Sequence, residues 1–513
     1  MTTANMTFSD IASYLKVELN QLLPNCSDLV VHGINSSVAV CYVSGLVDTK
    51  VLSSSILSVL TMLDEDEVNT ELIRQTITIC EIEREGNLDQ VALKLLQGHV
   101  YIAVMDEYEG LLCNIANFPA RAIAASENET VIFGPVLGFN ESLSTNIAVL
   151  RSYIKDPGLV TEPHIVGNKM ETRIQLTYMA DFVDEKYIDY VKSKLKQIKT
   201  DGLMGNALLM QKLQNHPYTI FPLMTLTERP DRTVQALMEG KVVIFMEGDS
   251  HVIIGPSSFI DFFISVEDRY MSWGTGLFIR MLRFVGLTMS VFLTPIYVAA
   301  LTFHYQMIPP ALIVSLIETR SKVPFPPLLE TLLLEITMEL LREAGVRLPT
   351  KVCQTIGIVG GIVIGQAAVQ AGFTSNILIM LVALAALGSF TTPNYLMGSS
   401  IRLIRYPMII MAGMWGILGI VFVAMVVFIH LLRQTSMGRP YLFPIIPFRR
   451  KDLTVDMLLT PKSHYSYRVS DTKSSLNSKT GKDQQSNAMS SRSSSKEPQS
   501  DVTNDSSSSN KDK

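Results

Sequence analysis

Two glutamates whose carboxylates could attract cations lie one helical turn apart in the segment Leu328–Gly345. Glu335 and Glu339 share one helical face, and Arg342 and Glu343 continue it. Carboxylates beside a membrane pore concentrate cations and repel anions, so Glu335 and Glu339 are candidate pore or mouth residues. The stripe equally fits the wet face of an interfacial helix, with Glu339–Arg342 as an ordinary ion pair. The residues alone leave both interpretations open.

Two glutamines lie in an otherwise apolar segment. Gln366 and Gln370 are one turn apart, and an amide in lipid needs a partner on a neighbouring helix or water in a pore. They are therefore further pore candidates. Small residues along the same helical face let helix backbones approach closely, which by itself favours packing over a pore. This candidate helix-packing face consists of Gly357, Gly361, Gly365, Ala368 and Gly372. Arg402 and Arg405, before the last apolar segment, are candidate interfacial anchors or gating contacts.

No motif for catalysis or cofactor binding occurs in the sequence. Asp48 and Asp184 could be imagined as paired carboxylates, but both are better explained as helix starts. The histidines are isolated, and the five cysteines are scattered without zinc-ligand spacing, as expected for reduced thiols in the cytosol. The net charge is −5, without a basic patch, which argues against nucleic acid as a partner. We expect no enzyme activity, no cofactor and no metal.

The composition of the chain changes twice, and these changes define three regions. Residues up to about Asp268 have the mixed charge of a soluble α/β domain, and residues 269–445 are mostly lipid-compatible. Val352–Ile401 contains no charged side chain, enough for two crossings of a bilayer. Residues 446–513 form a Ser-rich cytoplasmic tail that is expected to be disordered. We therefore predict a soluble half, an α-helical polytopic membrane domain and a disordered tail.

Four membrane spans are the simplest count. Basic residues flank both ends of the apolar block, which places both termini in the cytoplasm and requires an even number of spans. Met307–Leu316 is apolar but short, and prolines interrupt the chain on both sides of it. We therefore expect the segment 307–345 to be re-entrant or interfacial. Pro326 and Pro327 should start its second helix and Gly345 should end it. The expected spans are 284–303, 356–372, 377–393 and 406–432.

The soluble half contains an internal duplication. Tyr42–Lys50 matches Tyr178–Lys186 at Tyr, Val, Asp and Lys, and Gln97–Met105 parallels Glu239–Met246 in the same order. Each copy predicts two strands, a helix that begins at an aspartate, further helices, and a hairpin that follows a glycine. We predict two related α/β subdomains, over residues 1–140 and 141–268.

Six motifs in order resemble the GerA-type spore germination protein family. The resemblance is dense from Ile147 to Ile445, weaker over the first subdomain and absent from the tail; the stage V AF-type paralogues share most of the motifs. These motifs begin at Arg173, Glu228, Gln235, Pro324, Glu343 and Ile358.

The resemblance implies an A subunit of a nutrient germinant receptor. Such subunits sit in the inner membrane of the bacterial spore, with the soluble domain on the core side, beside a permease-like B subunit and a lipoprotein C subunit. They are thought to form a homo-oligomeric ring whose helices make a nutrient-gated cation channel. A non-conducting scaffold that docks the permease-like partner is the alternative. A transporter is weaker, because no acidic residue falls within a clear span.

Overall fold

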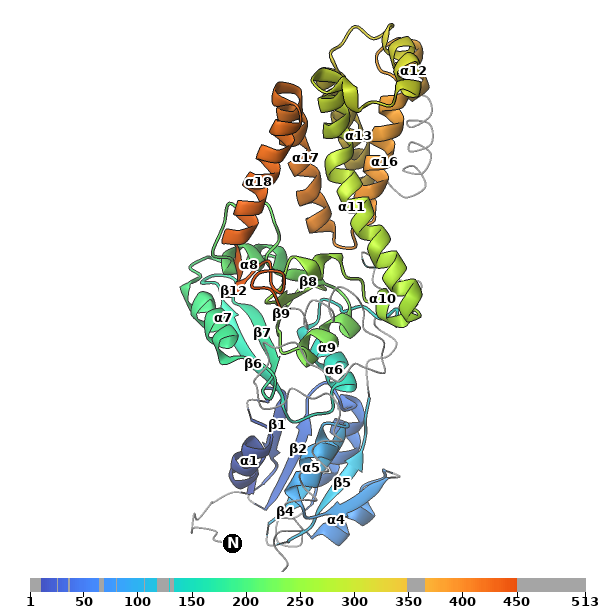
Figure 1. Cartoon of the computed structure of the whole chain (residues 1–513). Helices are drawn as coiled ribbons and strands as arrows, with labels where there is room; N and C mark the ends of the chain where they lie inside the picture. Colours follow the sequence, from blue (N-terminus) through green and yellow to red (C-terminus); the bar gives the residue numbers. More distant parts are fainter. Residues whose placement is uncertain are drawn as a thin grey trace, which may run out of the picture.

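The computed structural model shows an N-terminal half built on two β-sheets, which is the half predicted to be soluble, followed by a helical half (Figure 1). We call these the soluble half and the helical half. The helices lie at one end of the molecule, the first sheet at the other, and the second sheet between them. The structure describes residues 11–24, 26–35, 37–63, 69–79, 81–105, 107–117, 129, 133–347 and 365–449.

The first sheet has five antiparallel strands in the order β1-β2-β4-β5-β3. Side chains alternate across β2, so that Val38 and Val40 enter one hydrophobic cluster while Ala39 and Cys41 enter the cluster on the other face. Helices α1 and α5 cover the second of these faces. The elements are α1 (Ile11–Leu22), β1 (Leu29–Gly33), β2 (Val38–Val43), α2 (Thr49–Val51), η1 (Leu52–Leu57), α3 (Ser58–Leu60), α4 (Thr70–Thr76), β3 (Ile82–Glu85), α5 (Leu88–Leu95), β4 (His99–Val104) and β5 (Gly110–Asn114).

The second sheet repeats this strand order as β6-β7-β9-β10-β8. Helices α7 and α8 bury their apolar residues against one face, and α6 and α9 bury theirs against the other. The elements are α6 (Leu143–Tyr153), β6 (Leu159–Val166), β7 (Thr172–Met179), α7 (Glu185–Gln197), α8 (Asn206–Leu213), β8 (Thr225–Thr227), α9 (Pro230–Met238), β9 (Val242–Met246) and β10 (Val252–Gly255).

Both copies of the duplicated pattern have the features that the sequence predicts. Asp48 is the N-cap of α2 and accepts hydrogen bonds from the backbone N–H groups of Lys50 and Val51. Asp184 is the N-cap of α7 and accepts from Lys186 N–H. Gly98 and Gly240, each at the turn before a hairpin strand, have positive φ angles of 87° and 76°. The interpretation of both aspartates as helix starts is confirmed.

The helical half is centred on α11 (Trp273–Thr302). Among the described residues, α11 is the one helix both long and apolar enough to cross a membrane; α16 and α18 are apolar but shorter. Glycines allow α11 and α16 to touch: a Cβ on Gly388 would lie 2.3 Å from the carbonyl oxygen of Gly286. The remaining elements are η2 (Ile260–Phe263), α10 (Glu267–Tyr270), η3 (Tyr305–Met307), α12 (Pro310–Arg320), α13 (Pro327–Arg347), α15 (Gly365–Gln370), α16 (Asn376–Phe390), α17 (Tyr395–Trp415), α18 (Ile417–Arg433), β11 (Thr435–Ser436) and β12 (Arg439–Pro440).

Two expectations for this half differ from the structure. The segment 406–432, expected to be one span, belongs to two helices that meet at Gly416, whose φ of 61° and ψ of −137° no helix contains. Gly345 does not end α13, which continues to Arg347, although Pro327 does begin it. Gly357, Gly361 and most of the expected tail lie outside the described residues.

A buried ion pair joins the two sheets. Arg151 of α6 donates from Nε to Asp28 Oδ2 at 2.8 Å and from Nη2 to Oδ1 at 3.0 Å. Thr161 of β6 donates to the same carboxylate at 3.1 Å. Burial alone would raise the pKa of Asp28, but the charge and hydrogen bonds of Arg151 hold it below its usual value.

We predict that Arg151→Met lowers the free energy of unfolding by about 3 kcal/mol, because Asp28 is left charged and buried without its partner. Guanidinium unfolding of the full-length protein in detergent, followed by circular dichroism, measures this change. The stabilisation by Asp28 is present above its unfolded pKa and is lost as the pH falls through its lower folded pKa. Arg84→Met is the control, since Arg84 pairs with Glu71 at the surface. Equal effects of the two substitutions would contradict the prediction.

Candidate functional site

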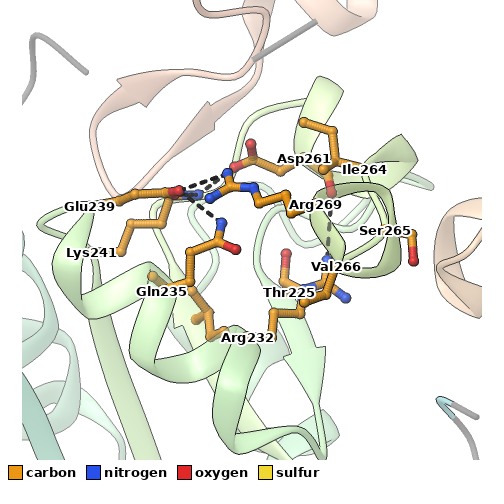
Figure 2. Close-up of a pocket in the computed structure, with 12 residues that line it drawn as sticks. Thr225, Arg232, Gln235, Glu239, Lys241, Asp261, Ile264, Ser265, Val266 and Arg269 are labelled. Carbon is orange, nitrogen blue, oxygen red and sulfur yellow. Dashed lines mark hydrogen bonds and ion pairs between the residues drawn. The ribbon is translucent and has the colours of Figure 1, made fainter. Parts of the chain in front are cut away.

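The candidate site is the junction where the second sheet meets the helical half. Figure 2 shows its charged centre, to which α9, the turn between α9 and β9, η2 and α10 contribute side chains. Lys241 Nζ lies 2.9 Å from Asp261 Oδ2 and 3.5 Å from Glu239 Oε2. Arg269 Nη2 lies 3.1 Å from Glu239 Oε1. Burial would raise the pKa of the Glu239 carboxyl, but Lys241 and Arg269 hold it below its usual value.

The cavity among these side chains has a volume of about 50 Å³. That volume admits a few water molecules and no nutrient. The charges are also paired with one another, so they do not form an open binding site for an ion. Their arrangement fixes α9, β9, η2 and α10 in one geometry.

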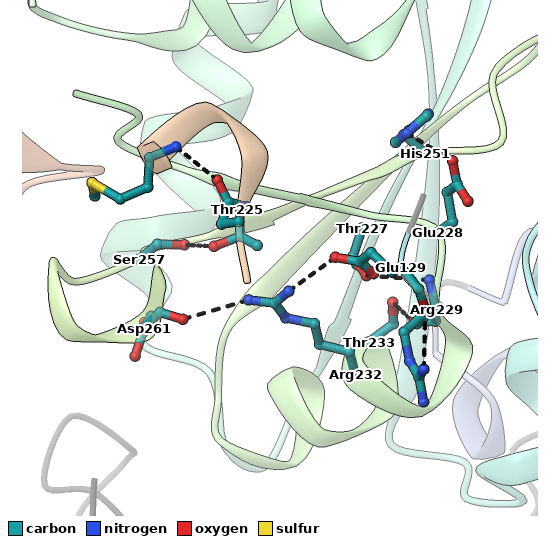
Figure 3. Close-up of polar contacts among 12 residues, drawn as sticks. Glu129, Thr225, Thr227, Glu228, Arg229, Arg232, Thr233, His251, Ser257 and Asp261 are labelled. Carbon is teal, nitrogen blue, oxygen red and sulfur yellow. Dashed lines mark hydrogen bonds and ion pairs between the residues drawn. The ribbon is translucent and has the colours of Figure 1, made fainter. Parts of the chain in front are cut away.

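A second polar network continues from this centre along β8 and β10 (Figure 3). Arg232 Nη1 lies 3.0 Å from Glu129 Oε1, and the hydroxyl of Thr227 donates a hydrogen bond to Oε2 of the same carboxylate. His251 Nε2 lies 2.9 Å from Glu228 Oε1 and its Nδ1 lies 3.1 Å from Asp249 Oδ1. The hydrogen bond of its ring to Asp249 and the charge of Glu228 raise the pKa of His251 against its burial.

Buried charges also hold the start of α11. Asp268 of α10 is almost fully buried and pairs with Arg280 at 3.2 Å and with Arg283 at 3.0 Å. Arg283 Nη1 donates a further bond of 2.7 Å to the carbonyl of Phe263. The first helix of the helical half therefore cannot rotate without breaking contacts to the soluble half.

The chain returns to the same junction after α18. Ser436 accepts a 3.0 Å hydrogen bond from Ser257 N–H and donates one of 2.5 Å to the carbonyl of Leu223. Tyr441, fully buried, donates from its hydroxyl to the carbonyl of Pro222 at 2.7 Å. The two ends of the helical half are thus fixed to one surface of the second sheet's domain.

The predicted charged residues meet inside the helical half. Glu335 Oε2 of α13 lies 2.6 Å from Arg405 Nη1 of α17, and Arg405 Nη2 donates to Ser290 Oγ of α11 at 2.8 Å. Glu339 lies 2.8 Å from Arg342 and 3.4 Å from Arg402. The side chain of Glu335 is 5% exposed and that of Glu339 is 42% exposed. The two glutamates therefore differ in their access to an aqueous path.

The amides and small residues lie elsewhere. Gln366 and Gln370 are exposed on the short helix α15. A Cβ on Gly365 would meet nothing within 4 Å, so within one chain this position packs against no described residue. Ala368 is half-buried, and Gly372 has a φ of 69° beyond the end of α15, which gives that glycine a backbone role.

In the helical half, sequence reasoning missed the buried charge of Glu330. Glu330 pairs with Arg320 at 3.1 Å and accepts bonds from Thr374 Oγ1 at 3.1 Å and Ser375 N–H at 2.7 Å. It links α12, α13 and the start of α16. The sequence feature that could have indicated this residue is its position in the first turn of α13, just after the prolines that begin the helix. Among the described residues, no group of three His, Cys, Asp or Glu side chains could hold a metal ion.

Comparison with known proteins identifies the family. The family model described as "Bacillus/Clostridium GerA spore germination protein" matches residues 17–470. This chain belongs to the GerA family. It is 40% identical to spore germination protein GerQA of Bacillus cereus over 87% of this chain and 90% of GerQA. It is 39% identical to spore germination protein KA of Bacillus subtilis (strain 168), over 80% of this chain and 76% of that protein.

A solved structure also matches part of this GerA-family chain. It is the N-terminal domain of the A subunit of the Bacillus megaterium spore germinant receptor GerK3, at 25% identity and a TM-score of 0.38, covering 50% of this chain and 99% of that one. Membership of the GerA family makes this chain a receptor A subunit rather than an enzyme. A 33% identical relative from Bacillus subtilis (strain 168), YfkQ, is named a membrane protein.

We predict that His251 stabilises the junction at low pH. Because the folded-state pKa of His251 is raised, its stabilisation is complete below the unfolded pKa of about 6.5 and is lost as the pH rises through the folded value. The difference in unfolding temperature between the wild-type protein and His251→Gln should shrink between about pH 5.5 and 8. His216→Gln, which removes a histidine outside this network, should show no such trend. A constant difference across this range would contradict the prediction.

We predict that Arg405→Met destabilises the helical half by about 3 kcal/mol, because Glu335 is left buried without its partner. Adding Glu335→Gln to this variant should restore part of the loss. Thermal unfolding in lipid nanodiscs measures both variants. The control is Arg347→Met, at the end of the same bundle, where the ion pair with Glu343 is exposed. A double variant no more stable than Arg405→Met would contradict the argument from charge pairing.

Proposed function

We propose that this chain is the membrane subunit of a nutrient germinant receptor and that several copies form a nutrient-gated cation channel. The observation that carries the proposal is the exposure of Gln366 and Gln370 on a helix in the apolar half. An amide in hydrocarbon needs a polar partner or pore water, and one copy of the described chain leaves these amides uncovered. A ring of copies around an aqueous axis gives them that environment.

The arrangement of the helical half supports the predicted topology. The residues before α11 and those after α18 contact the same soluble surface, as an even number of spans requires. With both ends in the spore core, we place the receptor in the inner membrane with cytoplasmic termini. We retain subdomains 1–140 and 141–268, a polytopic membrane domain over 269–445 and a tail over 446–513. The partners in this proposal are the permease-like B subunit, the lipoprotein C subunit, further copies of this chain and the lipid bilayer.

The charge network refines the pore assignment. Glu335 is locked to Arg405 within one copy, so it acts as a structural charge, while Glu339 keeps a partly exposed carboxylate. Glu339 is therefore the better candidate for the cation-attracting mouth. Arg402, which faces Glu339, is the corresponding candidate for a gating contact, and Arg405 for a packing contact.

A scaffold function is the second candidate. The buried carboxylates Glu330 and Glu335 in the described helical half are both paired with arginines of the same chain. A domain built only to hold helices together and to dock a permease-like partner would have this property.

Cation flux across proteoliposomes tests the two functions. The receptor subunits are reconstituted together, and nutrient-dependent flux is compared for wild type, Gln366→Leu and Glu339→Gln. We expect Gln366→Leu to abolish flux or lock it open, and Glu339→Gln to lower the cation-to-anion preference several-fold. The matched controls are Ala367→Leu, which adds bulk beside the amide, and Glu343→Gln, an exposed carboxylate outside the network. An assembled wild-type complex that conducts under no condition would favour the scaffold.

A further inference from the structure

A loop of the second sheet's domain lies directly beneath the helical half. It connects α8 to β8 and spans Gln214–Pro222, and we call it the headgroup loop. Tyr218 is 96% exposed and Ile220 is 41% exposed, although both are large apolar side chains on the soluble half. Exposed apolar residues grouped in this way mark a surface that meets another apolar phase.

The loop is attached to two helices of the helical half. Thr219 Oγ1 lies 3.1 Å from His430 Nε2 in the last turn of α18. Ser400, in the second turn of α17, donates a hydrogen bond to the carbonyl of Ile220. The aromatic ring of Phe221 packs against that of His430, with the centroids 6.0 Å apart. These contacts fix the height of the loop relative to the helices.

That height coincides with the end of the apolar surface of α18. Ile429 and Leu432 are 48% and 42% exposed, and Arg433 follows at once. A helix rises about 1.5 Å per residue, so the contact at His430 lies within about 5 Å of the last apolar side chain. The headgroup layer of a bilayer is about 5–8 Å thick on each side. The loop therefore falls within that layer when α18 spans the membrane.

The chain segments that form the loop and the two helices it contacts carry charges of one sign. No Asp or Glu occurs from Gly202 to Thr227, and none occurs between Glu343 and Asp452, the stretch that contains α17 and α18. Lys212 at the end of α8 and Arg433 at the end of α18 are exposed. His216 lies in the loop itself. A basic surface with an exposed tyrosine fits the headgroups of anionic lipids.

We propose that the headgroup loop binds the anionic phospholipid surface, with the ring of Tyr218 among the headgroups and Lys212 and His216 facing the phosphates. The loop is then a second membrane attachment of the soluble half, in addition to the covalent connections at α11 and α18. This attachment is independent of whether the helices conduct ions.

Depth-dependent fluorescence quenching tests the proposal. Tyr218→Trp is made in full-length protein in which Trp273→Phe and Trp415→Phe remove the natural tryptophans, and the protein is reconstituted in vesicles of brominated phosphatidylcholine and phosphatidylglycerol. The control is Tyr108→Trp in the same background. Tyr108 is 87% exposed in the β4–β5 hairpin of the first sheet, and that sheet lies at the opposite end of the molecule from the helical half (Figure 1). We expect the tryptophan at Tyr218→Trp to be quenched several-fold more by brominated lipid than that of the control, and less by aqueous iodide.

Two results would overturn the proposal. Quenching of both variants by iodide to the same extent would place the loop in water. Protection of Tyr218→Trp from both quenchers would show that protein, such as a second copy or another subunit, covers the loop.

The electrostatic part has its own test. Removing phosphatidylglycerol should reduce quenching of Tyr218→Trp by brominated lipid, and adding Lys212→Glu should have the same effect, since each basic residue beside an anionic surface changes partitioning about five-fold. Lys16→Glu on α1 of the first sheet is the matched control and should change nothing. Quenching that is indifferent to both the lipid charge and Lys212→Glu would overturn the electrostatic part.

Discussion

A charge that water cannot reach must have an opposite charge beside it, and this constraint shapes every boundary in the molecule. Arg151 and Asp28 join the two sheets, Asp268 with Arg280 and Arg283 joins the soluble half to α11, and Glu335 with Arg405 joins the helices. Apolar packing builds each part, but it is not directional. The buried ion pairs supply direction, because the N–H groups of a guanidinium donate to a carboxylate in few geometries.

The placement of these pairs makes the junction a mechanical connection. Asp268 holds the start of α11, and Ser436 and Tyr441 hold the chain after α18. Between these two points, Arg405 connects α17 to α11 and α13. A displacement of the helices by a partner must therefore strain contacts in the soluble half, and the reverse also holds. A receptor subunit needs such two-way coupling, whether it conducts ions itself or holds other subunits that conduct them.

Local sequence patterns predicted the structure correctly where a single residue determines the backbone conformation. Asp48 and Asp184 cap helices, and Gly98 and Gly240 take positive φ angles, as their positions predicted. The strands β3 and β8 were missed, since β3 is largely charged and β8 has three residues, so neither shows strand periodicity. The sequence also could not predict which charged side chains pair between different helices of the bundle. The carboxylate of Glu335 was predicted to lie on a helix face, but its partner Arg405 is seventy positions away, and spacing cannot indicate that contact.

A comparison of the two copies shows why only the second one forms the junction with the helical half. Glu239-Gly240-Lys241 forms the charged centre, while the first copy has Gln97-Gly98-His99 at the matching positions. Burial and the nearby charge of Lys94 lower the pKa of His99, which favours its neutral form. The first copy thus keeps the glycine that its fold requires and lacks the charges that would bind α10 and η2. Its connection to the second sheet includes the buried Asp28–Arg151 pair and the hydrogen bond from Thr161 to Asp28. One copy is therefore specialised to hold the helices, and the other is free of that constraint.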